Sequence, residues 1–476
     1  MDHTNLYING EWVEGAAGER FEVVNPATED ALASVASAET ADADAALDAA
    51  AQAMPIWNQK TPRERAEILR KAWELMTERL DHFARLITLE NGKAGNDARG
   101  EATYAAEFFR WFSEESVRTD GLITHAPASG ARILVQHKPA GIAVLVTPWN
   151  YPAAMGTRKI APALAAGCPV IIKPASETPL TMLALMPLLE EAGVPKGMVN
   201  VLPTKKTREV VEHMLHDPRV RVISFTGSTG VGRKLLKSAA DQILKPAMEL
   251  GGNAPLIVFD DADIDKAVEG AMLAKMRNLG EACTAANRFY VHEKVERAFV
   301  EKFSAAMGAL KMGNGLNESV DVGPLVNADT RDKVAAFVED AVAKGAKIEI
   351  GGHVPNEKGY FYPPTVMTNV SETADCVHDE IFGPVAAIQT FTDQDDVIRR
   401  ANDTEYGLVA YVFSEDMKRA MQVCERLEYG MVGLNRGLVS DPAAPFGGVK
   451  QSGLGREGGH EGILEFMETQ YISAEW

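Results

Sequence analysis

Three polar residues lie in loops of small residues or proline, where a side chain can reach a substrate. Cys283 follows a predicted helix in the run NLGEACT, and a nucleophilic thiol needs access of this kind. Glu249 precedes two glycines and is a candidate general base. Asn150 lies between two prolines in PWNYP, so its amide is a preset donor for a developing oxyanion. Each residue also has an ordinary interpretation: a packed thiol, a solvated carboxylate or a structural turn.

A glycine-rich run, FTGSTGVG at 225–232, ends a predicted strand and opens a predicted helix. Its glycines let the backbone approach a phosphate, and the first turn of the helix offers unpaired N–H groups to an anion. The spacing differs from G-x-G-x-x-G, so an ordinary strand-to-helix turn explains the run equally well.

The elements that must hold these loops alternate between strand and helix. This alternation predicts parallel sheets covered by helices, in two sheet domains with a ligand cleft between them. Asn9 and Gly10 predict a tight hairpin over Leu6–Val13, and Thr61 with Glu64 has a capping-box pattern. The first series has strands at 142–147, 170–173, 199–202 and 220–226, with helices near 153–166, 179–192, 207–216 and 229–240. The second has strands at 256–259, 289–292, 348–350, 385–391 and 408–413, with helices near 264–278 and 294–309.

Composition narrows the class of protein. Lys and Arg number 48 against 67 Asp and Glu, a net charge of −19 that argues against nucleic acid or an anionic membrane as partner. Four cysteines in 476 residues are not a disulfide framework, so we expect a reducing, cytoplasmic location. Cys376 with His378 provides too few ligands for a metal site, and we predict no metal. The N-terminus lacks signal-peptide features, and prolines interrupt the longest uncharged stretch, 139–157, so we predict no membrane helix.

Taken together, these stretches resemble the aldehyde dehydrogenase superfamily, in order and over nearly the whole chain. Within it, the chain is most similar to NADP-linked succinate-semialdehyde dehydrogenases at 157–159, 173–176 and 450–458. The family motifs are Pro148–Asn150, Lys173–Pro174, Phe225–Ser228, Glu249–Gly252, Cys283, Glu380–Pro384 and Pro445–Gly448.

The resemblance implies catalytic roles. Cys283 attacks the aldehyde carbon, and the Asn150 amide with the Cys283 backbone N–H holds the oxyanion of the thiohemiacetal. Glu249 activates the water that hydrolyses the thioester. Glu281 stands where the family usually has glutamine, and a second carboxylate near the thiol could raise its pKa or point away into a salt bridge. Ala285 replaces a second cysteine, so a redox-switch disulfide found in some relatives cannot form.

The resemblance also implies a nicotinamide cofactor. Ser176 stands where NAD-preferring members often carry glutamate, and its small side chain leaves Lys173 free to pair with a 2′-phosphate. We therefore predict NADP as the preferred cofactor and NAD as the alternative, with Glu177 able to oppose this preference by turning in. The implied cofactor-binding residues are Trp149, Lys173, Ser176, Gly227, Ser228, Gly232, Glu380 and Phe382.

Arg158, Arg277 and Ser440 match positions that hold the far carboxylate in the succinate-semialdehyde group. The ordinary interpretation of either arginine is a salt bridge. The alternative substrates are glutarate semialdehyde and uncharged aliphatic or aromatic aldehydes. The alternative classes are a non-redox thioester hydrolase and a non-catalytic scaffold, which retention of cofactor and catalytic residues disfavours.

The expected fold class is α/β, with a Rossmann-like cofactor domain, an α/β catalytic domain and a small β oligomerisation arm. Such an arm leaves an edge strand for a neighbour, so we expect a homodimer or homotetramer. The predicted bounds are 1–120 with 140–250 for the cofactor domain, 251–445 for the catalytic domain, and 121–139 with 446–476 for the arm and tail.

Overall fold

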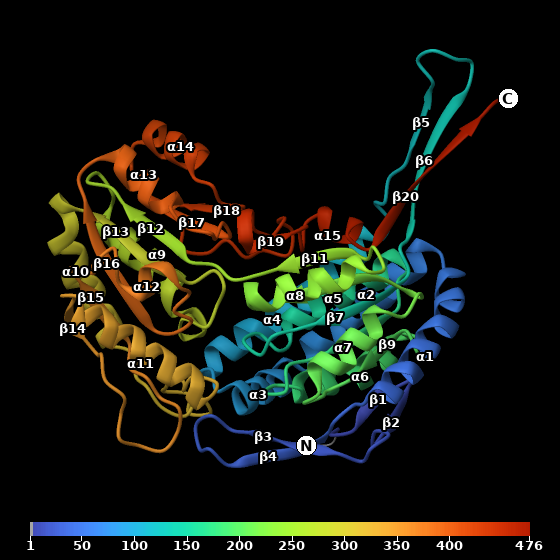
Figure 1. The fold of residues 1–476 in the computed structure, drawn as a ribbon, viewed down its shortest axis with the longest axis horizontal. Coiled ribbons are helices and arrows are strands. Elements are labelled where there is room, and N and C mark those ends of the chain that lie inside the picture. Colours follow the sequence, from blue (N-terminus) through green and yellow to red (C-terminus); the bar gives the residue numbers. More distant parts are fainter. Residues whose placement is uncertain (1–2) are drawn as a thin grey trace.

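The computed structural model describes residues 3–476 and contains two large sheets, each covered by helices (Figure 1). The first is eight-stranded, in the order β19-β11-β10-β7-β8-β9-β1-β2, and its five central strands are parallel. Every residue of the central strand β7 is buried, as its continuous apolar run predicts. The strands are β1 (Leu6–Ile8), β2 (Glu11–Val13), β7 (Ile142–Val146), β8 (Val170–Lys173), β9 (Val199–Val201), β10 (Val220–Thr226), β11 (Lys245–Glu249) and β19 (Gly453–Leu454). The helices of this series are α5 (Ala154–Ala166), α6 (Leu180–Ala192), α7 (Thr207–Leu215) and α8 (Thr229–Ala240).

The chain order in this sheet reverses between β7 and β10. It runs outward from β7 through β8 to β9 on one side, and through β10 to β11 on the other. Loops after the two strands at such a reversal diverge and leave a crevice at the carboxyl edge of the sheet. The loop after β7 carries Asn150, and the turn after β10 carries Gly227 and Ser228.

The second sheet has seven strands in the order β14-β15-β16-β13-β12-β17-β18, all parallel except β14. Glu249–Asn253 joins the two sheets, and Cys283 precedes β13, so the amino edge of this sheet faces the first domain. Its strands are β12 (Ala254–Val258), β13 (Ala286–His292), β14 (Lys347–Ile350), β15 (Thr365–Thr368), β16 (Val385–Phe391), β17 (Val409–Phe413) and β18 (Met431–Leu434). Its helices are α9 (Ile264–Met276), α10 (Glu293–Gly308), α11 (Ala328–Ala343), α12 (Asp375–His378), α13 (Gln394–Asn402) and α14 (Met417–Arg426).

The N-terminal region supplies a hairpin and a layer of helices. Asn9 and Gly10 both have positive φ in the turn between β1 and β2, which confirms the predicted hairpin. The capping box is also confirmed, since Thr61 N–H donates to Glu64 Oε2 at 2.7 Å and Glu64 N–H donates to Thr61 Oγ1 at 3.3 Å. The remaining elements here are α1 (Thr40–Asn58), α2 (Pro62–Glu78), α3 (Leu80–Asn91), α4 (Gly95–Glu115), β3 (Arg20–Val24) and β4 (Ala31–Ala36).

A three-stranded sheet in the order β20-β6-β5 projects from the body (Figure 1). β20 (Met467–Ala474) pairs antiparallel along the length of β6 (Arg132–Pro139), and β5 (Leu122–His125) is exposed at every residue. The glycine-rich tail before it contains the short helix α15 (Glu461–Leu464). Among residues 3–476, no helix is long and apolar enough to cross a membrane. The domain bounds given above stay a prediction.

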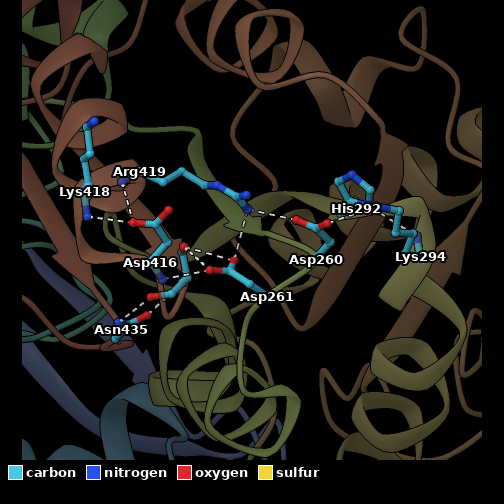
Figure 2. Close-up of polar contacts among 9 residues, drawn as sticks. Asp260, Asp261, His292, Lys294, Asp416, Lys418, Arg419 and Asn435 are labelled. Carbon is cyan, nitrogen blue, oxygen red and sulfur yellow. Dashed lines mark hydrogen bonds and ion pairs between the residues drawn. The ribbon is translucent and has the colours of Figure 1, made fainter.

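A network of charged and polar side chains lies at the carboxyl ends of the strands of the second sheet (Figure 2). Cys283 lies at the opposite, amino end of the strands. Asp261, after β12, accepts hydrogen bonds from Ser414 Oγ at 3.0 Å and from the Asp416 N–H at 2.7 Å, both after β17. Arg419 of α14 bridges Asp261 at 3.2 Å and Asp260 at 2.8 Å. The network therefore connects α14 to the carboxyl ends of two strands. Its cation, Arg419, is already paired with Asp260 and Asp261.

We expect Asp261→Ala to lower the free energy of unfolding by about 1–3 kcal/mol, because it leaves the Ser414 hydroxyl and the Asp416 N–H without their acceptor. Lys418→Ala, a change of an exposed side chain on the same helix, should stay within about 0.5 kcal/mol. Urea unfolding measures both. Equal stability of the two variants would contradict a stabilising role for the network.

Candidate active site

A cavity of about 250 Å³ lies where the two sheets meet. Its walls come from the loop after β7, the turn after β10, the segment before β13 and the tail after β18. Glu249, Lys173, Ser176 and Gly232 are not in its walls. The predicted residues that line it are Trp149, Asn150, Arg158, Gly227, Ser228, Arg277, Cys283, Glu380, Phe382 and Ser440.

The segment before Cys283 is held in a strained backbone. Asn278 and Leu279 have φ of 50° and 41°, in the left-handed region that non-glycine residues disfavour. The Asn278 N–H donates to Asp97 of α4 at 2.9 Å, and its side-chain amide donates to the Asn150 carbonyl at 2.9 Å. Sequence patterns predicted a helix through 278, but α9 ends at Met276 because these contacts pull the chain out of helical geometry.

The Cys283 thiol is half-buried and is a neutral group at physiological pH. Burial, together with the Glu380 and Glu249 carboxyls, raises its pKa to about 12 against the opposing effect of Arg158 and Arg277. A thiol in this state becomes a nucleophile only when a neighbouring base takes its proton.

Glu249, the last residue of β11, can act as that base. Its Oε2 is buried without a hydrogen-bond partner in the described chain. Burial raises its pKa well above the usual range, and the Glu457 carboxylate adds to this. A carboxyl of raised pKa is better matched to accepting a proton near neutrality than a solvated one. Gly447 leaves room for it, since a Cβ there would lie 2.9 Å from Glu249 Oε1.

Glu249 is under the electrostatic influence of a cluster of ion-paired side chains that was not predicted from the sequence. Glu457 pairs with Lys159, and its Oε2 lies 2.7 Å from Arg158 Nε; all three side chains are buried. Lys159 also donates to Ser224 Oγ at 2.9 Å. Arg158 is therefore in a salt bridge, the ordinary interpretation considered above, although its Nη2 is buried without a partner in the described chain.

The Arg277 guanidinium is held differently. Its Nε donates to the Tyr151 hydroxyl at 3.0 Å, and the group lies 5.3 Å from the Tyr151 ring centre. Neither of its terminal nitrogens has an acidic partner within the described residues. Tyr104 of α4, another residue missed from sequence, also lines the cavity, and its buried hydroxyl has no partner among residues 3–476. This wall thus offers several donors to an anionic end of a ligand.

The predicted cofactor residues Lys173 and Ser176, outside the cavity walls, have surroundings that suit an anionic group. Lys173 is buried, and no group in residues 3–476 accepts a hydrogen bond from its Nζ. Burial lowers the pKa of Lys173 to about 8. The neighbouring Lys205 contributes to this lowering, and Glu177 opposes it. Lys205, which the sequence patterns missed, donates to Ser176 Oγ at 3.4 Å. Ser176 in turn donates to Glu177 Oε2 at 3.2 Å. Two neighbouring ammonium groups suit a phosphate, because the Lys173 ammonium group has no hydrogen-bond acceptor of its own.

The other cofactor positions divide between open donors and close packing. Ser228 caps α8 without a side-chain hydrogen bond, which leaves first-turn N–H groups available to a pyrophosphate. A Cβ at Gly227 would lie 2.5 Å from the Phe225 ring, and one at Gly232 would lie 2.4 Å from Leu250 Cδ2, so a side chain at either position requires these neighbours to shift.

The side of the cavity predicted to bind the nicotinamide has a carboxyl group and two aromatic rings. Glu380 Oε1 accepts from the Gly252 N–H at 3.2 Å, and burial raises the pKa of Glu380 to about 7. The Phe382 and Trp149 rings pack edge-to-face, with their centres 5.3 Å apart. Within residues 3–476, no cluster of three or more His, Cys, Asp or Glu side chains could hold a metal ion.

Known proteins resemble this chain over nearly its full length. The model of the Aldehyde dehydrogenase family matches residues 12–472. A succinate-semialdehyde dehydrogenase of Paenarthrobacter nicotinovorans is 54% identical, covering 93% of this chain and 98% of that protein. A glutarate-semialdehyde dehydrogenase of Pseudomonas putida is 47% identical, covering 98% of this chain and 96% of that protein. The crystal structure of an E. coli NADP-dependent enzyme superposes with a TM-score of 0.98 at 46% identity, covering 100% of this chain and 98% of that one.

Iodoacetamide should modify Cys283 slowly at pH 7, because a thiol pKa of about 12 leaves a thiolate fraction about 1,000-fold below that of free cysteine. The rate should rise continuously between pH 7 and 9.5. Peptide mass spectrometry assigns the label, with Cys283→Ser as the control. A plateau within this range would contradict the neutral thiol.

Proposed function

The chain belongs to the aldehyde dehydrogenase family, and from this membership we propose that it oxidises succinate semialdehyde to succinate with NADP. The observation that carries the substrate is Arg277, a cation that lines the same cavity as the Cys283 thiol and has no acidic partner in the described chain. An arginine fork binds a carboxylate through two parallel hydrogen bonds. The similarity to named succinate-semialdehyde dehydrogenases supports this assignment.

The chemistry uses three residues of the chain. Glu249 takes the thiol proton, and Cys283 Sγ bonds to the aldehyde carbon. Asn150 Nδ2 has two hydrogens; the Glu281 carbonyl accepts one at 3.0 Å, and the second stabilises the oxyanion together with the Cys283 N–H. Trp149, Glu380 and Phe382 would hold the nicotinamide of NADP, which would supply the acceptor for the hydride of the substrate carbon. Glu249 releases the thiol proton to solvent and, ionised again, deprotonates the water that hydrolyses the thioester at Cys283.

The cofactor is a nicotinamide dinucleotide, and the NADP preference rests on the cations near Ser176. Lys173 and Lys205 bind the 2′-phosphate, and Ser176 adds no negative charge to oppose it. Glu177 makes its hydrogen bond to Ser176 instead of to a cofactor hydroxyl. The Ser228 turn holds the pyrophosphate, and Glu380 holds the nicotinamide ribose beside Phe382 and Trp149.

Glutarate semialdehyde is the second candidate substrate, because a glutarate-semialdehyde dehydrogenase is among the similar proteins. This aldehyde has one more methylene group than succinate semialdehyde, which the cavity would have to accommodate. The exposed strands of the arm, β5 and β20, support assembly into a homodimer or homotetramer through edge pairing. A cytoplasmic location follows from the cysteine usage. A panel of succinate semialdehyde, glutarate semialdehyde and butanal, each with both cofactors, tests the function directly.

Arg277→Ala should lower kcat/KM for succinate semialdehyde about 100-fold, because it removes a charged donor to the far carboxylate. Activity on butanal should survive, since butanal has no carboxylate. Arg426→Ala, which removes an exposed ion pair with Asp395, is the control. Equal losses on both aldehydes would refute the substrate assignment.

Ser176→Glu should lower the affinity for NADP by ~10-fold or more, because a carboxylate repels the 2′-phosphate. Lys205→Ala should weaken binding of NADP and leave binding of NAD unchanged. Fluorescence titration of each cofactor measures both effects. A wild-type preference for NAD in kcat/KM would overturn the assignment of NADP.

A further inference from the structure

Glu281 is a fully buried carboxyl group two residues before the nucleophile. Its Oε1 accepts a hydrogen bond from the Val326 N–H at 3.1 Å, in the segment that leads into α11. Its Oε2 is buried and has no hydrogen-bond partner in residues 3–476. The carboxyl therefore makes a single hydrogen bond, and it does not line the cavity that Cys283 lines. An ionised carboxylate in such a place would lack most of the donors it needs.

The charged groups around Glu281 are already paired with others. Lys93, which acts on it electrostatically, is bound to Glu101 and donates to the Asn150 carbonyl at 2.8 Å. Asp97, packed beside the same loop, accepts the Asn278 N–H. Burial raises the pKa of Glu281 to about 8, and the Val326 and Lys93 contacts oppose this only in part. At neutral pH the side chain is a neutral carboxylic acid, close in shape to a glutamine.

The main chain of Glu281 connects this acid to the oxyanion site. Its carbonyl accepts the side-chain amides of Asn150 at 3.0 Å and Asn278 at 2.9 Å. Its N–H donates to the Asn278 carbonyl at 2.8 Å. A shift of this one residue therefore moves the Asn150 amide and the Cys283 N–H together.

We infer that Glu281 is a positioning residue which, as a protonated acid anchored on Val326, aligns Asn150 with Cys283, and that its ionisation disrupts this alignment. A charged Oε2 would recruit water or draw Lys93 from its partners, and either response moves the loop. The inference rests on the proposed roles of Asn150 and Cys283 and not on the proposed substrate.

The test compares the pH dependence of kcat/KM for wild type and Glu281→Gln, with any aldehyde that both oxidise. The two should be similar at pH 7. At pH 9, one unit above a pKa of about 8, only about one-tenth of wild type is protonated, so Glu281→Gln should exceed it by about tenfold. Ionisation of Cys283 affects both proteins and cancels in the ratio. A ratio that stays near one from pH 7 to 9 would overturn the inference.

Two further variants separate positioning from stability. Glu281→Met keeps the volume but loses the hydrogen bond to Val326, and should lower kcat several-fold at every pH. Glu90→Gln changes another buried acid, with a pKa of about 8, that accepts the Leu180 and Thr181 N–H groups; it should retain the alkaline loss of wild type. Retained full activity in Glu281→Met, or loss of the alkaline decline in Glu90→Gln, would contradict the inference.

Two readouts do not require activity. The infrared band of a protonated carboxyl should be present at pH 7 in wild type and reduced in Glu281→Gln. Because the pKa of Glu281 is raised in the folded protein, the protonated acid stabilises the fold at low pH, and this contribution is lost as pH rises toward 8. The melting temperature of Glu281→Gln relative to that of wild type should therefore rise between pH 5 and 8. If no aldehyde is oxidised, the proposed function fails, while these two measurements still decide the ionisation of Glu281.

Discussion

A buried ion pair between Lys93 and Glu101 fixes the loop on which the candidate site depends. Both side chains are fully buried, so each charge needs the other and further hydrogen bonds to offset its lost hydration. Glu101 Oε1 accepts the N–H groups of Ala153 at 2.8 Å and Ala154 at 3.2 Å, at the start of α5. Lys93 donates to the Asn150 carbonyl and lies 4.1 Å from the Tyr151 ring centre. The pair therefore holds both ends of the turn that presents the Asn150 amide.

The same turn connects the two domains. Asn150 exchanges hydrogen bonds with the segment before Cys283: its carbonyl accepts from Asn278, and its amide donates to Glu281. The strained backbone at Asn278 is sustained by Asp97 of α4, the helix that also carries Glu101. One helix of the first domain thus braces both the donor of the oxyanion site and the loop of the nucleophile.

Three carboxyl groups of the candidate site have different surroundings: Glu249 and Glu281 are buried, and Glu380 is half-buried. Burial raises the pKa of Glu249, Glu281 and Glu380 alike. Glu249 has an unpartnered oxygen and the nearby charge of Glu457, so it suits proton transfer. Glu380 is tied to the Gly252 N–H, which suits a binding role. Glu281 is anchored on the Val326 N–H, and the positioning role inferred for it acts through its main chain. Lys173 and Arg277 are two cations without an ion-pair partner in residues 3–476, and they are the residues proposed to bind anionic ligands.

Much of this protein was predictable from its sequence. Local patterns predicted the strands and helices from 142 to 240 to within one residue, the first hairpin and the capping box of α2, because turn chemistry and side-chain periodicity act over a few neighbours. The ordered motifs predicted the family, and ten of the 22 residues that line the cavity are predicted site residues. The roles of those residues and the domain bounds stay predictions. Tertiary structure alone decided the direction of the Glu281 side chain, the salt bridge of Arg158, and the places of Tyr104 and Lys205. Lys159 and Glu457 are 298 positions apart, and their pairing depends on where the C-terminal tail crosses β11. No local pattern encodes such a contact, because burial and charge pairing arise only when distant segments pack together.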